Sequence, residues 1–234
     1  MAEILIVLGI IGIIAEMTIP TLMQSVGERE VVSKLKKDYT VISNAYNLIK
    51  EDEGTYDSWG TGDMSSANTH IIIGNMFKEQ LKFSVNCIGK SKDEVISKCG
   101  DFEAKPEEDS RAILSDGTLI AFRGWSPDCS WHWGNSGLLT NVCGYIAVDI
   151  NGLKNPNVAG KDRFDFLIAK DGIVPWGTVG QIYYKFPDYC NKNVGKNLVD
   201  VTIGGACTAW IIYNENMDYL HCDDLSWTGK TRCD

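Results

Sequence analysis

The side chains best suited to chemistry are the oxygen donors in VDINGLKNPNVAGKDRFDF, residues 148–166. Aspartate and asparagine recur there between glycines, and their oxygens are the hard ligands that Ca²⁺ prefers. Two interpretations stay open: a calcium site built from Asp149, Asn151 and Asp162, or an Asx-rich turn in which these side chains accept bonds from backbone amides, the commoner structure. The spacing is not that of an EF-hand. Asn157 and Asp165 are further oxygen donors in this segment.

The sequence supports no enzyme motif. The histidines stand alone, without the spacing of paired metal ligands: they are His70, His132 and His221. Residues 134–137 resemble a serine nucleophile loop, but the following glycine is missing and G-x-S-x-G is absent. Residues 89–91 and 229–231 end like a phosphate loop, yet each lacks the first glycine. We therefore predict that the chain is not an enzyme and requires no cofactor, with Ca²⁺ as the one candidate.

The cysteines are even in number, and no two have the spacing of a zinc half-site or a thioredoxin-like motif. Disulfides persist in oxidising compartments, so we predict a disulfide set and a function outside the cytoplasm. Connectivity does not follow from sequence alone. Adjacent pairing closes the shortest loops and is the pairing that we expect. The pairs would be Cys87 with Cys99, Cys129 with Cys143, Cys190 with Cys207, and Cys222 with Cys233.

Composition excludes several classes of protein. Hydrophobic residues make up 44% of the 234 residues and charged residues 23%, which argues against a polytopic membrane protein and against a mainly disordered one. With 22 Lys and Arg against 31 Asp and Glu, the net charge is -9. Broad binding to phosphate backbones needs clustered cations, so we predict no specific nucleic-acid partner.

The first residues differ from the rest of the chain. The run ILIVLGIIGIIA, residues 4–15, carries no polar side chain, and after Glu16 the apolar character resumes as far as Met23. Such a segment could just span a bilayer core. A secretory signal peptide has a basic region before the apolar run and a small-residue cleavage site after it. Neither is present, so we expect the run to be retained.

The next residues have the pattern of an amphipathic helix. From Val31 to Ile49 apolar side chains recur every three or four positions, with lysine, aspartate and asparagine between them. We predict helix from about Ile4 to Lys50, interrupted only by Pro20 and Gly27 and ending near Gly54. At about 1.5 Å per residue this helix is roughly 70 Å long, so half of it must project from the domain.

After Gly54 the sequence is typical of sheet and loops. Residues 112–122 form two apolar runs around Asp116-Gly117, a strong hairpin signal, and a second Asp-Gly follows at 171–172. A short helix is expected near residues 72–81. Further strands are predicted at residues 145–150, 164–169, 181–186 and 206–213.

The opening AEILIVLGIIGIIAEMTIPTL resembles the N-terminal segment of type IV pilins and of the pseudopilins of type II secretion. The resemblance covers about 25 residues. It implies a leader that a dedicated peptidase removes before an N-methylated residue, with a glutamate soon after. Glu3 and Pro20 match family positions, whereas the leader, the cleavage glycine and the usual Phe-Thr pair are missing. We expect the processed residues to lie upstream of Met1, and the methylated residue is not assigned.

The resemblance also implies how the segment works. Burying a carboxylate is costly unless it is paired, so Glu3 is expected to neutralise the terminal amine of an adjacent subunit. The alternative is that Glu3 lies among lipid headgroups. Pro20 removes a helical hydrogen bond, and Gly9 and Gly12 weaken the helix, so the segment is expected to stretch or kink when subunits pack. Major pseudopilins similarly carry a calcium loop in their β region.

Aromatic residues form the last group of candidates. Trp125, Trp131, Trp133 and the pair Tyr183-Tyr184 supply large contact areas. We expect them in the core or in contacts between subunits. Carbohydrate binding is the less favoured interpretation.

Together these features predict an α+β fold in which a long N-terminal α-helix packs on a C-terminal antiparallel β-sheet domain, the pilin ladle fold. Residues 1–26 would form a hydrophobic stem, 27–54 the amphipathic half of the helix, and 55–234 a disulfide-rich head. The expected function is polymerisation with copies of itself into a helical filament, after residence in the inner membrane with its assembly machinery and leader peptidase. The filament would be a surface pilus or a periplasmic pseudopilus. The alternatives are a minor pilin, a secretion pseudopilin, or a membrane-tethered enzyme or ligand-binding domain.

Overall fold

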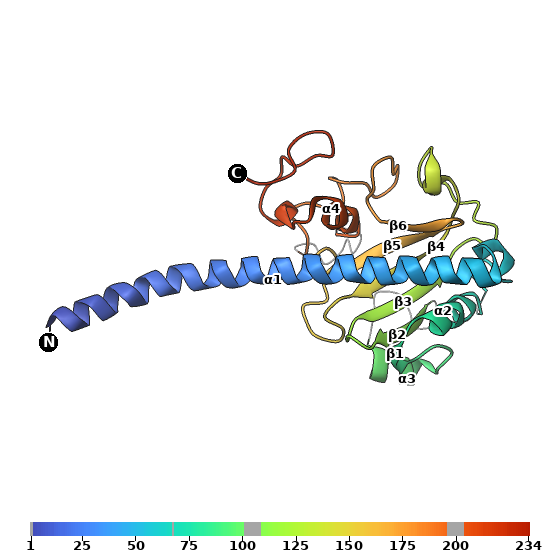
Figure 1. Cartoon of the computed structure of the whole chain (residues 1–234), viewed down its shortest axis with the longest axis horizontal. Coiled ribbons are helices and arrows are strands. Elements are labelled where there is room, and N and C mark those ends of the chain that lie inside the picture. The colour runs from blue at the N-terminus through green and yellow to red at the C-terminus, as the bar shows by residue number, and fades with distance from the viewer. Residues whose placement is uncertain (1, 67, 101–108, 196–203) are drawn as a thin grey trace.

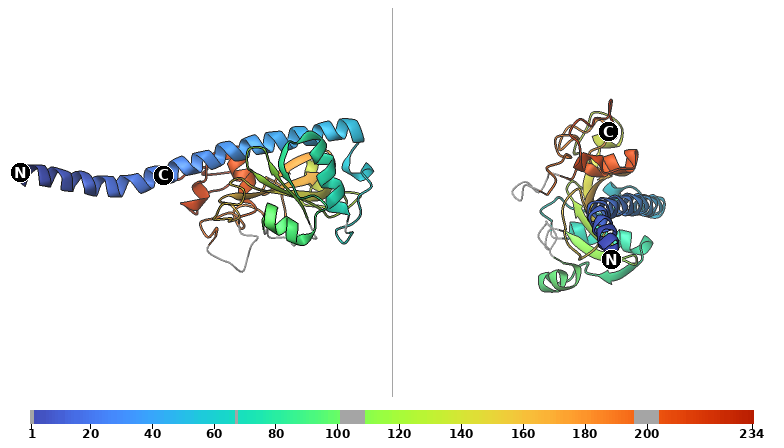
Figure 2. Two further views of the ribbon diagram at one scale, coloured as in Figure 1. Left: turned by 90° about the horizontal axis from the view of Figure 1, so that it is seen from below. Right: turned by 90° about the vertical axis from the view of Figure 1, so that its left-hand side faces the viewer.

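The computed structural model describes residues 2–66, 68–100, 109–195 and 204–234, and within residues 2–22 it describes only the side chain of Glu16. The architecture is α+β, with one long N-terminal helix and a six-stranded antiparallel sheet in the order β1-β2-β3-β4-β5-β6. Figure 1 shows the second half of the helix lying across the sheet while its first half projects beyond the head. Figure 2 shows the helix on one side of the sheet.

The helices are α1 (Ala2–Glu53), α2 (Thr69–Gln80), α3 (Lys92–Cys99) and α4 (Cys207–Asn214), with short 3₁₀ turns η1 (Tyr56–Ser58), η2 (Gly137–Thr140) and η3 (Asp218–Leu220). The strands are β1 (Phe83–Asn86), β2 (Ser110–Leu114), β3 (Leu119–Gly124), β4 (Val142–Asp149), β5 (Arg163–Ala169) and β6 (Gly172–Pro175). The expected long helix, the helix near 72–81 and both Asp-Gly hairpins are confirmed.

The packed half of α1 follows the predicted periodicity. Leu35, Ile42, Tyr46 and Ile49 are all buried, and they occupy one face of the helix. Tyr46 Oη donates to the backbone oxygens of residues 169 and 170 at 2.8 Å each, which ties the helix to the turn between β5 and β6. The helix ends at Gly54, whose φ of +82° suits glycine and whose amide donates to the Lys50 carbonyl.

Antiparallel register places alternate residues on opposite faces of the sheet. Ile120 pairs with Val148, and Val148 pairs with Phe164, so these three side chains share the face covered by α1, α2 and α4. The opposite face carries two smaller cores. One is rich in tryptophan and includes Leu167, and the other packs α3 against β2 and β3 around the Cys87–Cys99 disulfide.

All eight cysteines are paired, and the pairs are the adjacent ones: Cys87–Cys99, Cys129–Cys143, Cys190–Cys207 and Cys222–Cys233. Each bridge closes a short loop, and together they secure the head at four places. Each of the four has at least one cysteine in a loop or turn outside the helices and strands. A head with long irregular segments gains most from such links, because they restrict the unfolded chain.

Two strand predictions are wrong. The segment predicted as a strand over residues 206–213 lies largely in α4 (Cys207–Asn214), whose first five residues are all buried, so a continuous apolar run did not distinguish strand from helix. Residues 181–186 form a turn. Gln181 makes a single bridge with Gly134, and Tyr184 then adopts a φ of +47°, which ends the extended backbone.

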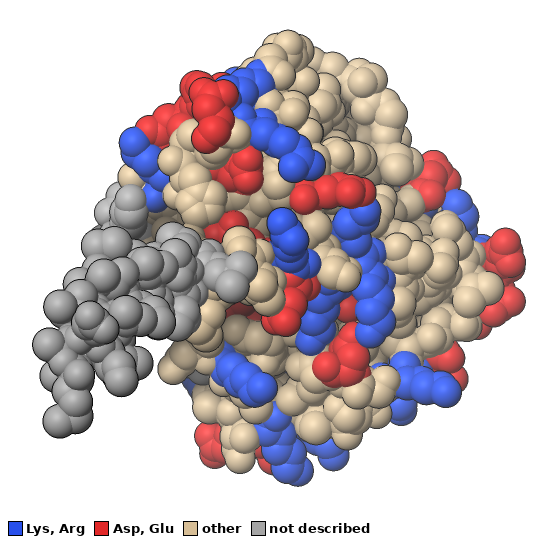
Figure 3. Space-filling model, turned by 60° about the vertical axis from the view of Figure 1, so that its left-hand side comes forward, with Lys and Arg blue, Asp and Glu red and all other residues tan. Residues whose placement is uncertain are grey.

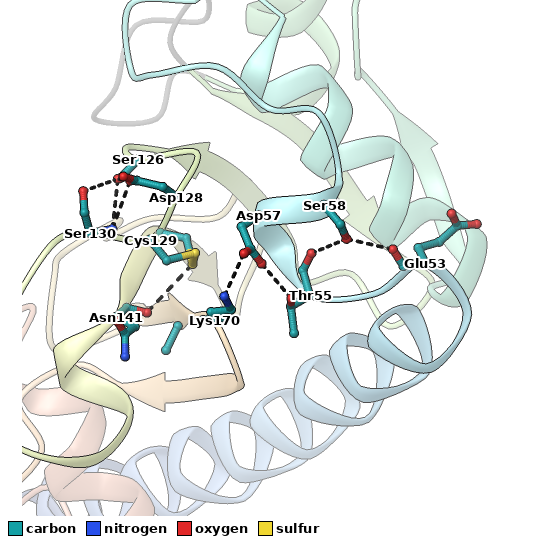
Figure 4. A network of polar contacts seen from close by, with 12 residues as sticks. Glu53, Thr55, Asp57, Ser58, Ser126, Asp128, Cys129, Ser130, Asn141 and Lys170 are labelled. Atoms are coloured by element: carbon teal, nitrogen blue, oxygen red, sulfur yellow. Dashed lines mark hydrogen bonds and ion pairs between the residues drawn. A yellow bond between two sulfur atoms is a disulfide. The ribbon is translucent and has the colours of Figure 1, made fainter.

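Polar contacts attach the end of α1 to the sheet, as Figure 4 shows. Ser58 donates to the carbonyl of Glu53, the last residue of α1, and Thr55 donates to Asp57 at 2.6 Å. Asp57 in turn accepts from Lys170 Nζ at 2.7 Å, in the turn between β5 and β6. The chain leaving α1 is therefore bonded directly to the strand pair on which the helix lies.

Candidate functional site

The projecting half of α1 is one candidate site. Its helical backbone is continuous through residue 20. The residues predicted to act in assembly, Glu3, Gly9, Gly12 and Pro20, lie outside the residues whose side chains are described. Among the described residues, no helix is both long and apolar enough to cross a membrane.

Packing begins only a few turns further along α1. Met23 is 69% exposed and Val26 47% exposed, whereas Val31 and Val32 are the first side chains to pack against the main core. Between them, Glu28 lies 2.9 Å from His221 Nε2, which joins the helix to the segment after η3. The helix therefore leaves the head near residue 28, and its described side chains before that point are exposed.

The second candidate site is the loop between β4 and β5. Asp149 is the last residue of β4 and Asp162 precedes β5, and they are only 2% and 4% exposed. Asp162 accepts from Asn151 Nδ2 at 2.9 Å and from the amides of Asn157 and Val158 at 2.9 and 2.6 Å. Asp149 Oδ1 accepts from the amide of Asn151. The structure thus brings together the three predicted ligands, Asp149, Asn151 and Asp162.

The amide of Asn157 completes this cluster. One terminal atom of its side chain lies 3.1 Å from Asp149 Oδ2 and 2.7 Å from the Lys154 carbonyl oxygen. With nitrogen in that place, the amide donates to both acceptors. With oxygen there, three oxygens face one point, which is unfavourable unless a proton or a cation lies between them. Asn151 Oδ1, also buried, has no hydrogen-bond partner in the described structure.

The carboxylates of Asp149 and Asp162 also repel each other. Burial and the neighbouring charge of Asp162 raise the pKa of the Asp149 carboxyl to about 7, although hydrogen bonds from backbone amides act in the opposite direction. Two buried carboxylates at close range are costly unless a proton or a cation compensates them. In this loop the carboxylates of Asp149 and Asp162 accept hydrogen bonds from backbone and side-chain amides, and these bonds offset part of their mutual repulsion.

A cleft of about 260 Å³ adjoins the loop. It is lined by Asp149, Asn157 and Arg163, by the turn at residues 152–153, and by Cys99 and Gly100 at the end of α3. Arg163 lowers the pKa of Asp149 and donates to the Asn157 carbonyl at 3.4 Å. The guanidinium therefore partly compensates the carboxylates from the open side.

Several other sequence candidates lie elsewhere. Asp165 is inside β5, opposite Ala147 and outside the loop. The described residues contain no group of three or more His, Cys, Asp or Glu side chains arranged to hold a metal ion, so the oxygen set depends on asparagine and on a carbonyl. The carbonyl of Lys154 was not predicted, since sequence patterns identify side chains and not the direction of a backbone oxygen.

The histidines do not converge in the described structure. His70 lies on α2, where burial and then Arg123 lower its pKa. His132 is in the loop before β4, and His221 contacts Glu28. Figure 3 shows acidic and basic side chains interspersed over one face of the head, without a single basic surface.

Comparison of the chain with protein-family models, with curated proteins and with solved structures found no match.

Proposed function

We propose that the chain is a structural subunit of an extracellular filament of the type IV pilus class, with the pilin ladle fold. The observation that carries the proposal is the division of α1. One continuous helix is packed on a sheet from residue 31 onward, yet it extends for many turns beyond the head with an apolar sequence. Burial of that apolar surface is the driving force for polymerisation with other copies.

The proposed path follows from the two halves of the helix. Before assembly, residues 1–26 lie in the inner membrane and the head lies outside the cytoplasm, where its disulfides persist. Assembly machinery and a leader peptidase are the partners that the resemblance implies. In the filament the stems form the centre, and the disulfide-linked heads form the surface of a pilus or of a periplasmic pseudopilus. The subunit role is that of a major pilin, a minor pilin or a pseudopilin.

Glu3 is proposed to neutralise the terminal amine of a neighbouring subunit. An unpaired carboxylate in an apolar surrounding is costly, so pairing would be gained only on assembly. Gly9, Gly12 and Pro20 are proposed to let the stem stretch or kink as helices pack.

The test is electron microscopy of sheared extracellular material from cells that express the chain. We expect helical filaments that contain it. Glu3→Ala should abolish or strongly reduce them while the head stays folded, and Glu16→Ala, which removes an exposed carboxylate of the same helix, should leave them intact. Normal filaments from Glu3→Ala would reject the role of Glu3, and a chain that is always monomeric outside the cell would reject the filament itself.

We also propose that the loop between β4 and β5 binds Ca²⁺. Its donors are the carboxylates of Asp149 and Asp162, the amide oxygens of Asn151 and Asn157, and the Lys154 carbonyl. Binding would require Asn157 to present oxygen rather than nitrogen to Asp149. The bound cation would then link the two ends of the loop beside the exit of α1, and so stabilise the head.

Thermal unfolding of the full chain tests this proposal. Excess Ca²⁺ should raise the melting temperature, and a chelator should lower it and expose the loop to protease. Asp149→Asn should remove both effects. Asp188→Asn, an exposed aspartate outside the loop, is the matched control and should keep them. If calcium and chelator leave both the melting temperature and the protease pattern of the parent chain unchanged, the loop is an Asx turn and no metal site.

A further inference from the structure

Two loops that are distant in sequence form one surface next to β6. The first comprises residues 129–142, and the second comprises residues 177–184. Gly134 forms a bridge with Gln181, and the Ile182 amide donates to the Trp133 carbonyl at 2.8 Å. A Cβ at Gly134 would lie 2.6 Å from the Gly180 carbonyl oxygen, so the loops approach as closely as glycine allows. In Figure 1 both loops lie beyond β6.

A row of stacked indole rings fills this surface. Trp125 is stacked between Trp131, at a centroid distance of 5.1 Å, and Trp133, at 5.2 Å. Trp176 supports the row edge-on, with its ring 4.6 Å from that of Trp133. Tyr184 continues the row at 5.8 Å from Trp133. Rings held in this way lose little further freedom on binding, which is what a preformed site requires.

The two ends of the row are exposed. Trp131 is 38% exposed, and Trp125 is the one ring that contacts it in the described part of the chain. At the other end Tyr183 is 55% exposed and Tyr184 39%. Gln181 Nε2 donates to the carbonyls of both tyrosines, at 2.6 and 3.2 Å, and fixes Tyr184 in its unusual left-handed conformation. A buried amide thus keeps two aromatic side chains at the surface.

The charge of this surface separates it from the rest of the head. None of residues 129–148 and none of residues 172–184 is Asp, Glu, Lys or Arg, although charged residues make up 23% of the chain. Charged side chains resume at Asp128 and Lys185. Stacking platforms for nucleic acid need a cationic groove along the backbone, and such a groove is missing from these two segments. The surface therefore suits a ligand that is polar but uncharged.

We propose that this aromatic surface, defined by Trp131, Tyr183 and Tyr184, binds neutral carbohydrate. The pyranose ring has an apolar C–H face that packs flat on an indole or phenol ring, and hydroxyl groups at its edge that need hydrogen-bond partners. The hydroxyls of Tyr183 and Tyr184 are such partners, and the exposed residues Asn135 and Asn141 belong to the same loop as Trp131. Apolar walls with a few orienting polar groups are the usual composition of a small-molecule site. The inference concerns single subunits and does not rest on filament assembly.

The test is direct binding to the full chain, purified in a zwitterionic detergent without a sugar headgroup. The neutral probes are cellotetraose and chitotetraose, whose β-linked rings present flat faces. The charged probes are tetragalacturonate and a single-stranded DNA oligonucleotide. Tryptophan fluorescence and calorimetry report binding. We expect saturable binding of at least one neutral probe and none of either charged probe. Trp131→Ala and Tyr183→Ala should each weaken it about tenfold or more, a change of about 1.4 kcal/mol.

Tyr213→Ala is the matched control, because Tyr213 on α4 is also 55% exposed but belongs to another surface. It should bind like the parent chain. If Trp131→Ala destabilises its own loop, Tyr183→Ala still tests the surface, because Tyr183 lies in the other loop. Failure of both neutral probes to bind, equal binding of a charged probe, or an equal loss in Tyr213→Ala would each overturn the proposal. If the two variants instead alter only self-association in sedimentation, the surface is a contact between copies of the chain.

Discussion

The two halves of α1 share a backbone conformation but not an environment. From residue 31 to 53 the helix is buried along one face by the sheet, α2 and α4, and Leu35, Ile42 and Tyr46 are inaccessible to solvent. From residue 23 to 26 its side chains are exposed, and Met23 is the most exposed large apolar residue among those described. Packing by the head, rather than helix propensity, therefore sets where α1 is stabilised in the single chain.

The head stabilises one half of the helix by packing, whereas the other half projects beyond the head. The amphipathic half has already buried its apolar face, so it gains little from further contacts. The projecting half has an apolar sequence, and its described residues Met23 and Val26 are exposed, so burying this surface against another apolar surface would be favourable. We therefore expect substitutions in the packed half to affect folding and substitutions in the projecting half to affect assembly.

The largest expected effect tests the packed half directly. Tyr46→Ala removes a buried ring and both hydrogen bonds to the turn between β5 and β6. We expect it to lower the free energy of unfolding by about 3 to 5 kcal/mol, measured by chemical denaturation. Met23→Ala, in the exposed part of the same helix, should change it by less than about 0.5 kcal/mol. Similar losses from both substitutions would contradict the contrast between the two halves.

A smaller loss of stability is expected from removing a disulfide that does not involve α1. Replacing both Cys190 and Cys207 by alanine removes the disulfide that joins α4 to the loop before it. The two cysteines are separated by 17 positions in the sequence. We expect a loss of about 3 kcal/mol in the free energy of unfolding, because the unfolded chain regains freedom. α1 should keep its helical signal in circular dichroism. A loss of helicity across α1 at temperatures where the sheet remains folded would show that α4, not the sheet, holds the helix.

The smallest of these effects concerns a carboxyl group in the packed half. Asp38 is 1% exposed, and burial together with the charge of Asp116 raises its pKa to about 6, against the opposing effects of Thr118, Lys34 and Lys37. The folded state therefore binds a proton that the unfolded state has released between about pH 4 and 6, so stability from this group falls as pH rises through that window.

Asp38→Asn should remove this pH dependence. At pH 7 we expect the variant to gain roughly 2 kcal/mol in the free energy of unfolding over the parent chain, with little difference near pH 4. Denaturation at several pH values measures the effect. Glu16→Gln, on the exposed part of α1, is the control and should leave the profile unchanged. A variant less stable than the parent at pH 7 would mean that the charged carboxylate is needed for packing.

Local patterns were sufficient for much of this fold. The three-and-four spacing of apolar residues predicted the packed face of α1, and Gly54 marked its end. Two Asp-Gly pairs predicted the turns at residues 116–117 and 171–172. These features depend on residues that are neighbours in the sequence, so the sequence alone predicts them. The strand predicted over residues 206–213 is wrong because the first five residues of α4 are buried in succession, and a short apolar run has no period that separates strand from helix.

The loop between β4 and β5 shows what sequence patterns do not predict. Its aspartates and asparagines were evident in the sequence, but that pattern is commoner in an Asx turn than in a metal site. Only the fold places the Asn157 amide between Asp149 Oδ2 and the Lys154 carbonyl. The direction of a backbone oxygen depends on φ and ψ of the folded loop, and no residue type encodes it.

The sequence by itself determined that this chain has an apolar, helical stem, a disulfide-rich head and a net negative charge, because composition and periodicity depend on residue types alone. The tertiary structure decided where the helix leaves the head, which oxygens meet between β4 and β5, and which aromatic rings reach the surface. Each of these depends on pairs of residues far apart in the chain. Such pairs come together only when the sheet register and the loop contacts are formed.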